Sequence, residues 1–265
     1  MDVIVPINCE AAWNYWQNPL VTMRLLELGL TPYREAWELQ REIFREVIAG
    51  RKEDTLILVE HLHVYTFGRG TDRANFLLTD ATLRELGAEK FEIDRGGDVT
   101  YHGPGQLVGY PILNLAHFKE DLGWYLRSLE ETIIEVLRTY DVDGFRIKGR
   151  TGVWVTPPPF EGGDDRPRSR GVIRSEEKIC AIGVYASRWC TMHGFAFNIN
   201  TDLSYFQHIV PCGISDRGVT SLAKVLGRGI EFEDARSRYA RAFEAVFHVV
   251  LEREEYEFSR LETES

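Results

Sequence analysis

A glycine-rich loop at residues 95–106 is the part of this sequence best suited to binding a ligand. It reads Arg-Gly-Gly-Asp-Val-Thr-Tyr-His-Gly-Pro-Gly-Gln and lies between two strand-like runs. Because glycine has no side chain, such a loop lets the backbone approach a ligand closely. Arg95 could bind a carboxylate or phosphate or close a structural ion pair, and His102 could be a general base or a hydrogen-bonding scaffold. The spacing matches neither a Walker sequence nor GxGxxG, so the residues alone also allow a turn-rich connection without a ligand.

Cys212 is the candidate nucleophile. It lies between Pro211 and Gly213, a context that predicts a turn, where nearby backbone amides could stabilise an oxyanion during acyl transfer. Free cysteine is also among the most buried residue types, and a thiol becomes a nucleophile only when a base or a cation lies near it. The local sequence therefore leaves a buried structural cysteine and a catalytic one both open.

Lys178 is the candidate partner of that thiol, because it heads an otherwise apolar strand at residues 179–184. An ammonium group beside a thiol would stabilise the thiolate and could then protonate a leaving group, and the two groups would titrate as a unit. The alternative is an exposed lysine at the end of a strand.

Three other residues compete for a chemical role. Cys180 follows Lys178 by two positions and should share its face of the strand, but it lies among isoleucine and alanine and is predicted to belong to the core. His61 and His63 alternate along a strand-like segment, and without a third ligand they make a weak metal site, so we predict no metal.

Composition narrows the class of protein. The 265 residues carry a net charge of −10, which argues against non-specific nucleic-acid binding but not against a local basic patch for an acidic partner. No run is long enough to span a membrane, and residues 1–6 lack the basic start of a secretory signal. The four cysteines, at 9, 180, 190 and 212, show no CxxC spacing, which favours reduced thiols in the cytoplasm.

Helical and strand periodicities place these residues on a mixed framework. Three helices are predicted, at 31–50 with Thr31 as its cap and Gly50 as its stop, at 121–140, and at 232–251. Strands are predicted at 24–30, 55–60, 91–94, 107–115, 152–155, 178–186 and 191–199, with a loop or strand end at 61–70. The strands and helices interleave but also cluster, which favours an α+β or mixed α/β domain over a regular βαβ array.

The predicted domain organisation has one catalytic domain at residues 23–252. An extension at 1–22 precedes it, and a charged tail at 253–265 follows it. Within the domain, a Pro-, Gly- and Arg-rich tract at about 156–177 is predicted to be a surface insertion.

Several segments, in order, resemble the lipoyl(octanoyl) transferase family, which is related in fold to biotin and lipoate protein ligases. The resemblance covers roughly residues 24–221 apart from the insertion. Its motifs are 61–69, 95–106, 152–155, 178–183, 193–198 and 211–214.

The resemblance implies a fold, an activity and a set of site residues. The fold would be a mixed sheet with helices packed on one side. Cys212 would carry the acyl group as a thioester and Lys178 would tune it, whereas the neighbours of Lys148 do not resemble the catalytic strand. The substrate-binding residues would be Arg95, Gly96, Gly97, Asp98, Val99, Thr100, Tyr101, His102, Ala181, Ile182, Gly183, Gly194, Phe195 and Ala196.

The implied reaction takes an octanoyl group from octanoyl-acyl carrier protein and gives it to a lysine of a lipoyl-domain protein. It would be the first step of protein lipoylation from endogenous octanoate. The acceptors would be lipoyl domains of 2-oxoacid dehydrogenase complexes and the glycine cleavage H protein, with no cofactor, nucleic acid or membrane. The sequence departs from the family pattern at the insertion and at His63, where the family more often has proline.

Three alternatives stay open at this stage. An ATP-dependent lipoate or biotin ligase would share the fold but activate a free acid as an adenylate. A non-catalytic module that binds lipoyl or acyl-carrier domains would keep the fold without the chemistry, against which Cys212 and Lys178 argue. A cysteine hydrolase would need a His/Asn or His/Asp partner set, and none is evident in the sequence.

Overall fold

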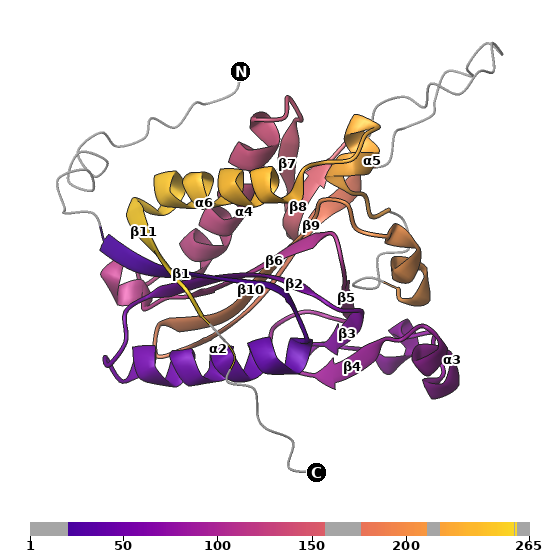
Figure 1. The fold of residues 1–265 in the computed structure, drawn as a ribbon, viewed down its shortest axis with the longest axis horizontal. Coiled ribbons are helices and arrows are strands. Elements are labelled where there is room, and N and C mark those ends of the chain that lie inside the picture. The colour runs from indigo at the N-terminus through magenta and orange to yellow at the C-terminus, as the bar shows by residue number, and fades with distance from the viewer. Residues whose placement is uncertain (1–20, 157–175, 211–217, 257, 259–265) are drawn as a thin grey trace.

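A twisted eight-stranded sheet forms the centre of the computed structural model, which describes residues 21–156, 176–210, 218–256 and 258. The strands lie in the order β11-β1-β2-β6-β10-β9-β8-β7, and a separate three-stranded sheet has the order β4-β3-β5 (Figure 1). The strands are β1 (Val21–Thr31), β2 (Thr55–His61), β3 (Val64–Phe67), β4 (Glu89–Glu92), β5 (Thr100–His102), β6 (Gln106–Ile112), β7 (Gly144–Ile147), β8 (Arg150–Val155), β9 (Glu177–Ser187), β10 (Cys190–Asn198) and β11 (Val249–Glu254).

The large sheet is mixed, as predicted. Strands β11, β1 and β2 run parallel to one another. All the remaining neighbours in the sheet, β2-β6, β6-β10, β10-β9, β9-β8 and β8-β7, pair antiparallel. The α-helices are α2 (Tyr33–Ile48), α3 (Asp80–Glu85), α4 (Leu122–Arg138), α5 (Leu222–Leu226) and α6 (Phe232–Phe247). Short 3-10 helices are η1 (Arg73–Asn75), η2 (Leu115–His117) and η3 (Leu203–His208). Among the described helices, none combines the length and the apolar character needed to cross a membrane.

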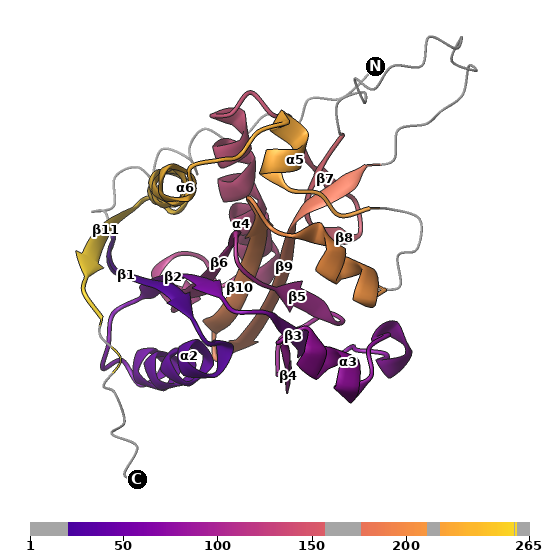
Figure 2. The same cartoon turned by 45° about the vertical axis from the view of Figure 1, so that its right-hand side comes forward.

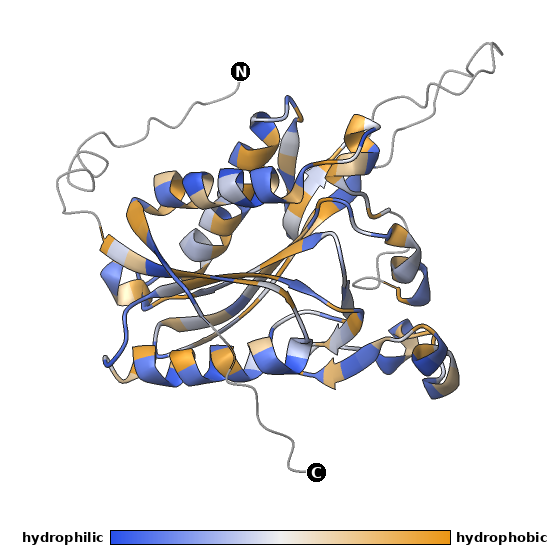
Figure 3. Ribbon diagram, viewed as in Figure 1, coloured by the Kyte–Doolittle hydropathy of each residue, from blue (hydrophilic) through white to orange (hydrophobic). Residues whose placement is uncertain are grey.

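Helices cover both faces of the large sheet, not one face as the resemblance implied. Helices α4 and α6 lie on one face and α2 lies on the other (Figure 1). Most of the buried residues of α2 are apolar and recur every three or four positions, which gives that helix one apolar side to pack on the strands (Figure 3). Every residue of the central strand β6 is buried, so both faces of the sheet must be covered, and this requires two helical layers.

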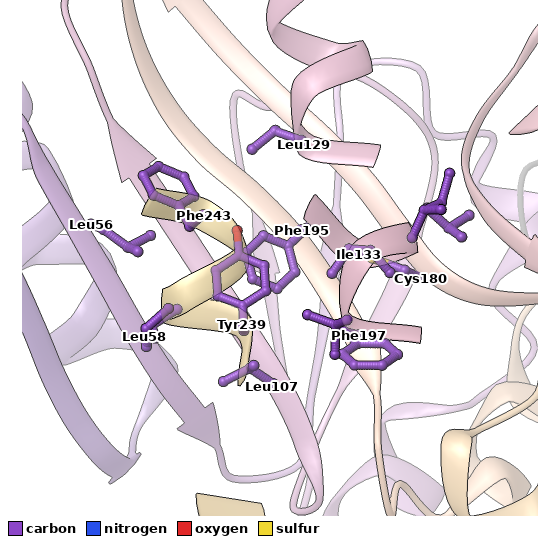
Figure 4. Packing of buried hydrophobic residues seen from close by; sticks show 14 of the residues in the cluster. Leu56, Leu58, Leu107, Leu129, Ile133, Cys180, Phe195, Phe197, Tyr239 and Phe243 are labelled. Atoms are coloured by element: carbon purple, nitrogen blue, oxygen red, sulfur yellow. The ribbon is translucent and has the colours of Figure 1, made fainter. Parts of the chain in front are cut away.

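The main core lies between the sheet and the α4–α6 pair. Figure 4 shows Tyr239 and Phe243 of α6 packed against side chains of β2, β6 and β10, with Leu129 and Ile133 of α4 beside them. The ring centroids of Phe195 and Tyr239 are 4.5 Å apart. These side chains are essentially inaccessible to solvent, so the core fixes the position of the strands that carry the site.

Several local predictions need correction. Thr31 does not cap α2, because its hydroxyl donates to the carbonyl of Leu28 and Pro32 occupies the cap position. The last helix does not reach residue 251. It ends at Phe247, His248 adopts a left-handed conformation (φ 56°), and the chain returns as β11, which includes Arg253 and Glu254 of the predicted tail.

The sequence did not reveal strands β3, β5 and β7. The small sheet and α3 lie beside one end of the large sheet in both views (Figures 1 and 2). The backbone N–H of Gly96, in the loop after β4, donates to the carbonyl of Val184 in β9. This contact holds the glycine-rich loop over the large sheet. Most of the predicted extension and of the predicted insertion lies outside the described residues.

Candidate active site

A cavity of about 570 Å³ lies between the glycine-rich loop and strands β9 and β10. Thirteen of the fourteen predicted substrate-binding residues line it, and the exception is Tyr101. The ring of Tyr101 is completely buried on the other side of β5, where its hydroxyl lies 2.8 Å from Nδ1 of His63. Alternation along a strand explains why Thr100 and His102 face the cavity while Tyr101 does not.

Arg95 fixes the glycine-rich loop through hydrogen bonds of its guanidinium group. Its side chain is almost fully buried, and Nη2 donates to the carbonyl oxygen of Thr66 at 2.7 Å and to the hydroxyl of Thr66 at 3.0 Å. A second nitrogen, Nη1, donates to the carbonyl of Gly96 at 3.1 Å. These bonds join the loop to the small sheet and hold an arginine at the cavity wall.

His102 belongs to a buried hydrogen-bond network. The amide of Gln106 donates to the carbonyl of Tyr101 and to Oδ1 of Asn198, which leaves Oε1 of Gln106 to accept from Nδ1 of His102 at 2.8 Å. Burial holds the pKa of His102 well below its usual range, so the ring is neutral at pH 7. Of the two roles considered for His102, this network supports the hydrogen-bonding scaffold.

His193 is a cavity residue that the sequence placed in the 193–198 motif but did not include among the predicted site residues. It has a left-handed backbone (φ 60°) within β10, an uncommon conformation for a residue with a side chain. Its Nε2 lies 2.8 Å from Oδ1 of Asp94, yet burial still lowers the pKa of the imidazole because desolvation outweighs the carboxylate. The positive φ depends on tertiary packing, and no local sequence signal announces it. Other lining residues that were not among the predicted site residues include Tyr33, Tyr110, Leu126, Gly149, Arg150, Thr151, Asn198 and Val219.

Lys178, the predicted partner of the Cys212 thiol, lines the cavity. Its Nζ lies 4.8 Å from the ring centroid of Trp154, within the range of a cation–π contact. The backbone of Lys178 is fixed on its other side, because its N–H donates to the carbonyl of Gly218 and its carbonyl accepts from Thr220. Residues 218–220 follow directly after the segment that contains Cys212.

The comparisons with known proteins identify the family. The model of the lipoyl protein ligase A/B catalytic domain matches residues 32–244. The chain belongs to this family.

Octanoyltransferases are similar to the chain over most of their length. The protein of Parabacteroides distasonis is 46% identical over 231 residues, which are 85% of this chain and 99% of that one. The protein of Rubrobacter xylanophilus is 48% identical over 220 residues, 82% and 90% of the two chains. Because these relatives are octanoyltransferases, the chain is an acyltransferase.

Solved structures confirm the fold as that of a lipoate protein ligase catalytic domain. A bipartite lipoate protein ligase of Thermoplasma acidophilum superposes with a TM-score of 0.66 at 16% identity, covering 89% of this chain and 88% of that chain. A lipoate-protein ligase A bound with ATP gives a TM-score of 0.65 at 15% identity, with 89% and 90% covered. At such low identity these likenesses concern the fold alone.

Cys212 lies outside the described residues, and its flanks are well fixed. The N–H of Val210 donates to the carbonyl of Asn75 at 2.8 Å, and Gly218 is bonded to Lys178 as described above. The sequence alternative, Cys180, is completely buried in the core, and burial raises the pKa of its thiol. Lys148 is exposed and does not line the cavity.

His61 and His63 do not form a metal pair. Both ring nitrogens of His61 are engaged, with Nδ1 2.9 Å from the carbonyl of Thr31 and Nε2 2.7 Å from the hydroxyl of Tyr110. His63 instead stacks on Tyr205, with ring centroids 4.3 Å apart. Across the described ranges, no three His, Cys, Asp or Glu side chains gather so that they could hold a metal ion.

Proposed function

We propose that this acyltransferase moves an octanoyl group from octanoyl-acyl carrier protein to a lysine of a lipoyl-domain protein, through a thioester on Cys212. The acceptors are lipoyl domains of 2-oxoacid dehydrogenase complexes and the glycine cleavage H protein, and the reaction takes place in the cytoplasm. The observation that carries the proposal is the position of Lys178, at the cavity wall and bonded to the residues that follow the Cys212 segment.

The cavity is large enough to hold an acyl chain. Its volume lies within the range of small-molecule sites, and its walls include Ile182, Val184 and Phe195. From Lys178 to Val184, β9 extends for roughly 20 Å, which is longer than an eight-carbon chain. We therefore assign the cavity-lining residues of the loop and of β9 and β10 to acyl binding.

The first half-reaction forms the acyl-enzyme. The thiolate of Cys212 attacks the thioester carbonyl of the donor, the tetrahedral intermediate collapses, and the carrier thiolate leaves. The ammonium of Lys178 stabilises the attacking thiolate and protonates the leaving thiolate, which regenerates an amine. One thioester replaces another, so this step is nearly balanced in free energy.

The second half-reaction forms the amide. The lysine amine of the acceptor attacks the carbonyl of the acyl-enzyme, Cys212 leaves as a thiolate, and Lys178 takes the proton lost by the attacking nitrogen. Because an amide is more stable than a thioester, this step is downhill and needs no nucleotide. Acid–base assistance by one such group is worth about 10²–10⁴-fold in rate.

The proposal is tested by the donor requirement. Purified protein should octanoylate a lipoyl domain when given octanoyl-acyl carrier protein without ATP, with ping-pong kinetics. Cys212→Ala should abolish turnover, and Lys178→Ala should slow acyl-enzyme formation without preventing donor binding. Activity only with ATP and free octanoate would instead establish the ligase reaction, and binding of a lipoyl domain without turnover would establish a non-catalytic module.

A further inference from the structure

The pairing of β8 with β9 is irregular beside Lys178. Val155 lies opposite Glu177 and Trp154 opposite Lys178, but Val153 lies opposite Cys180. Ile179 therefore has no partner across the ladder, which is the arrangement of a β-bulge in β9.

The bulge changes which way the side chains point. Ile179 and Cys180 are neighbours, yet both are completely buried in the core that α4 and α6 cover, and Figure 4 shows Cys180 beside Ile133 of α4. Lys178 lies outside that core and lines the cavity. In a regular strand Lys178 would share a face with Cys180 and its ammonium would enter the apolar core. The expectation that these two residues point the same way was wrong for this reason.

Gly152 makes room for the bulge on the neighbouring strand. Its φ of 120° is one that residues with side chains rarely adopt. A Cβ at this position would lie 2.6 Å from the carbonyl oxygen of Cys180 and 3.5 Å from Cε of Lys178. Any larger residue must therefore displace the backbone of β9 where it turns Lys178 outward.

Glu130 of α4 holds Gly152 in place. Its carboxylate is inaccessible to solvent, and Oε1 accepts from the N–H of Gly152 at 3.0 Å. The other oxygen, Oε2, is paired with Nη1 of Arg127 at 2.6 Å and with Nε of Arg146 at 3.0 Å. A buried carboxylate is costly unless it is fully paired, and the two arginines pair the oxygen that Gly152 does not use.

We propose that Glu130 and Gly152 are positioning residues for Lys178: they maintain the bulge that turns its ammonium from the core into the cavity. This inference rests on the role of Lys178 given under the proposed function. Neither residue touches the reacting atoms, so their effect must pass through Lys178.

The test compares Gly152→Ala with Gly87→Ala. Gly87 also has a positive φ (61°), but a Cβ there meets nothing within 4 Å and the residue lies away from the cavity. Gly87→Ala places a side chain at a left-handed φ that residues other than glycine sometimes adopt, whereas the φ of Gly152 is more costly for alanine. The kcat values are therefore compared per folded enzyme, and only Gly152→Ala moves Lys178. With octanoyl-acyl carrier protein as donor, Gly152→Ala should lower kcat on the order of 10²-fold with little change in the donor KM, the loss expected for a misplaced group. Gly87→Ala should leave kcat unchanged.

A double-mutant cycle separates positioning from simple loss of structure. In a Lys178→Ala background, Gly152→Ala should cause little further loss of kcat, because the group that it displaces is already gone. Glu130→Gln should show the same non-additivity, since one amide oxygen cannot serve Gly152 and both arginines, and it carries the test if Gly152→Ala does not fold. Circular dichroism at the assay temperature confirms that each variant compared is folded.

Two results overturn the inference, and they are distinguishable. Additive losses in the cycle, or equal kcat values for the two alanine variants, would show that the bulge does not position Lys178 while leaving the proposed function intact. A Lys178→Ala protein with the wild-type rate would overturn both proposals together.

Discussion

Acid should destabilise the protein through His61, which lies completely buried beneath the cavity. Nδ1 of its ring donates to the carbonyl of Thr31, and Nε2 accepts from the hydroxyl of Tyr110, so both nitrogens are satisfied in the neutral ring. Burial lowers the pKa of His61 from 6.5 to about 4. Between pH 6.5 and about 4, His61 is therefore protonated in the unfolded chain but neutral in the folded protein.

The sign and size of the effect follow from this difference. The stability contributed by neutral His61 is present in full above pH 6.5 and is lost as the pH falls towards 4. Between these limits one such group costs about 1.4 kcal/mol per pH unit, or roughly 3 kcal/mol in total.

The assay is urea unfolding at pH 7, 6, 5 and 4 for the wild type and for His61→Gln. Other groups titrate in both proteins, and the difference between the two free energies of unfolding isolates His61. That difference should shrink by roughly 3 kcal/mol from pH 7 to pH 4. Parallel loss of stability in the two proteins would refute the buried neutral histidine.

Three further predictions concern the site and its support. Trp154→Leu should remove the contact of the ring with the Lys178 ammonium, worth about 0.5–2 kcal/mol. Acyl-enzyme formation should therefore slow by roughly 2- to 30-fold in a stopped assay, whereas Trp154→Phe should retain most of the wild-type rate. Gly183→Val should crowd the side chain of Arg95, which a Cβ at Gly183 would approach to 3.1 Å, so the donor KM should rise and shorter acyl donors should be favoured in competition assays. Phe243→Ala should lower the free energy of unfolding by about 3–5 kcal/mol, measured in urea, and a loss below 1 kcal/mol would contradict the central place of α6 in the core.

The sequence predicted the elements that depend on local signals. The helix at α4 follows its apolar stripe, and Asp121 caps it by accepting from the N–H of Trp124. The glycine-rich loop was expected to bring the chain close to a ligand, and eight of its twelve residues line the cavity.

Features that depend on tertiary packing, such as strand β11 and the bulge in β9, could not be predicted from the sequence. The helical spacing of Phe243, Phe247 and Val250 predicted that the helix continues beyond Phe247, but pairing with β1 makes this segment a strand. The bulge at Ile179 depends on Gly152 of the neighbouring strand. The alternation of residues along β9 alone therefore placed Lys178 and Cys180 on the same face, although the bulge places them on opposite faces.

The measurement that tests the account most directly is intact-protein mass spectrometry after incubation with octanoyl-acyl carrier protein, followed by peptide mapping. The account predicts the mass increase of one octanoyl group, labile to hydroxylamine and located on Cys212, with slower formation in Lys178→Ala. An intact donor with no adduct, or an adduct on a residue other than Cys212, would contradict it.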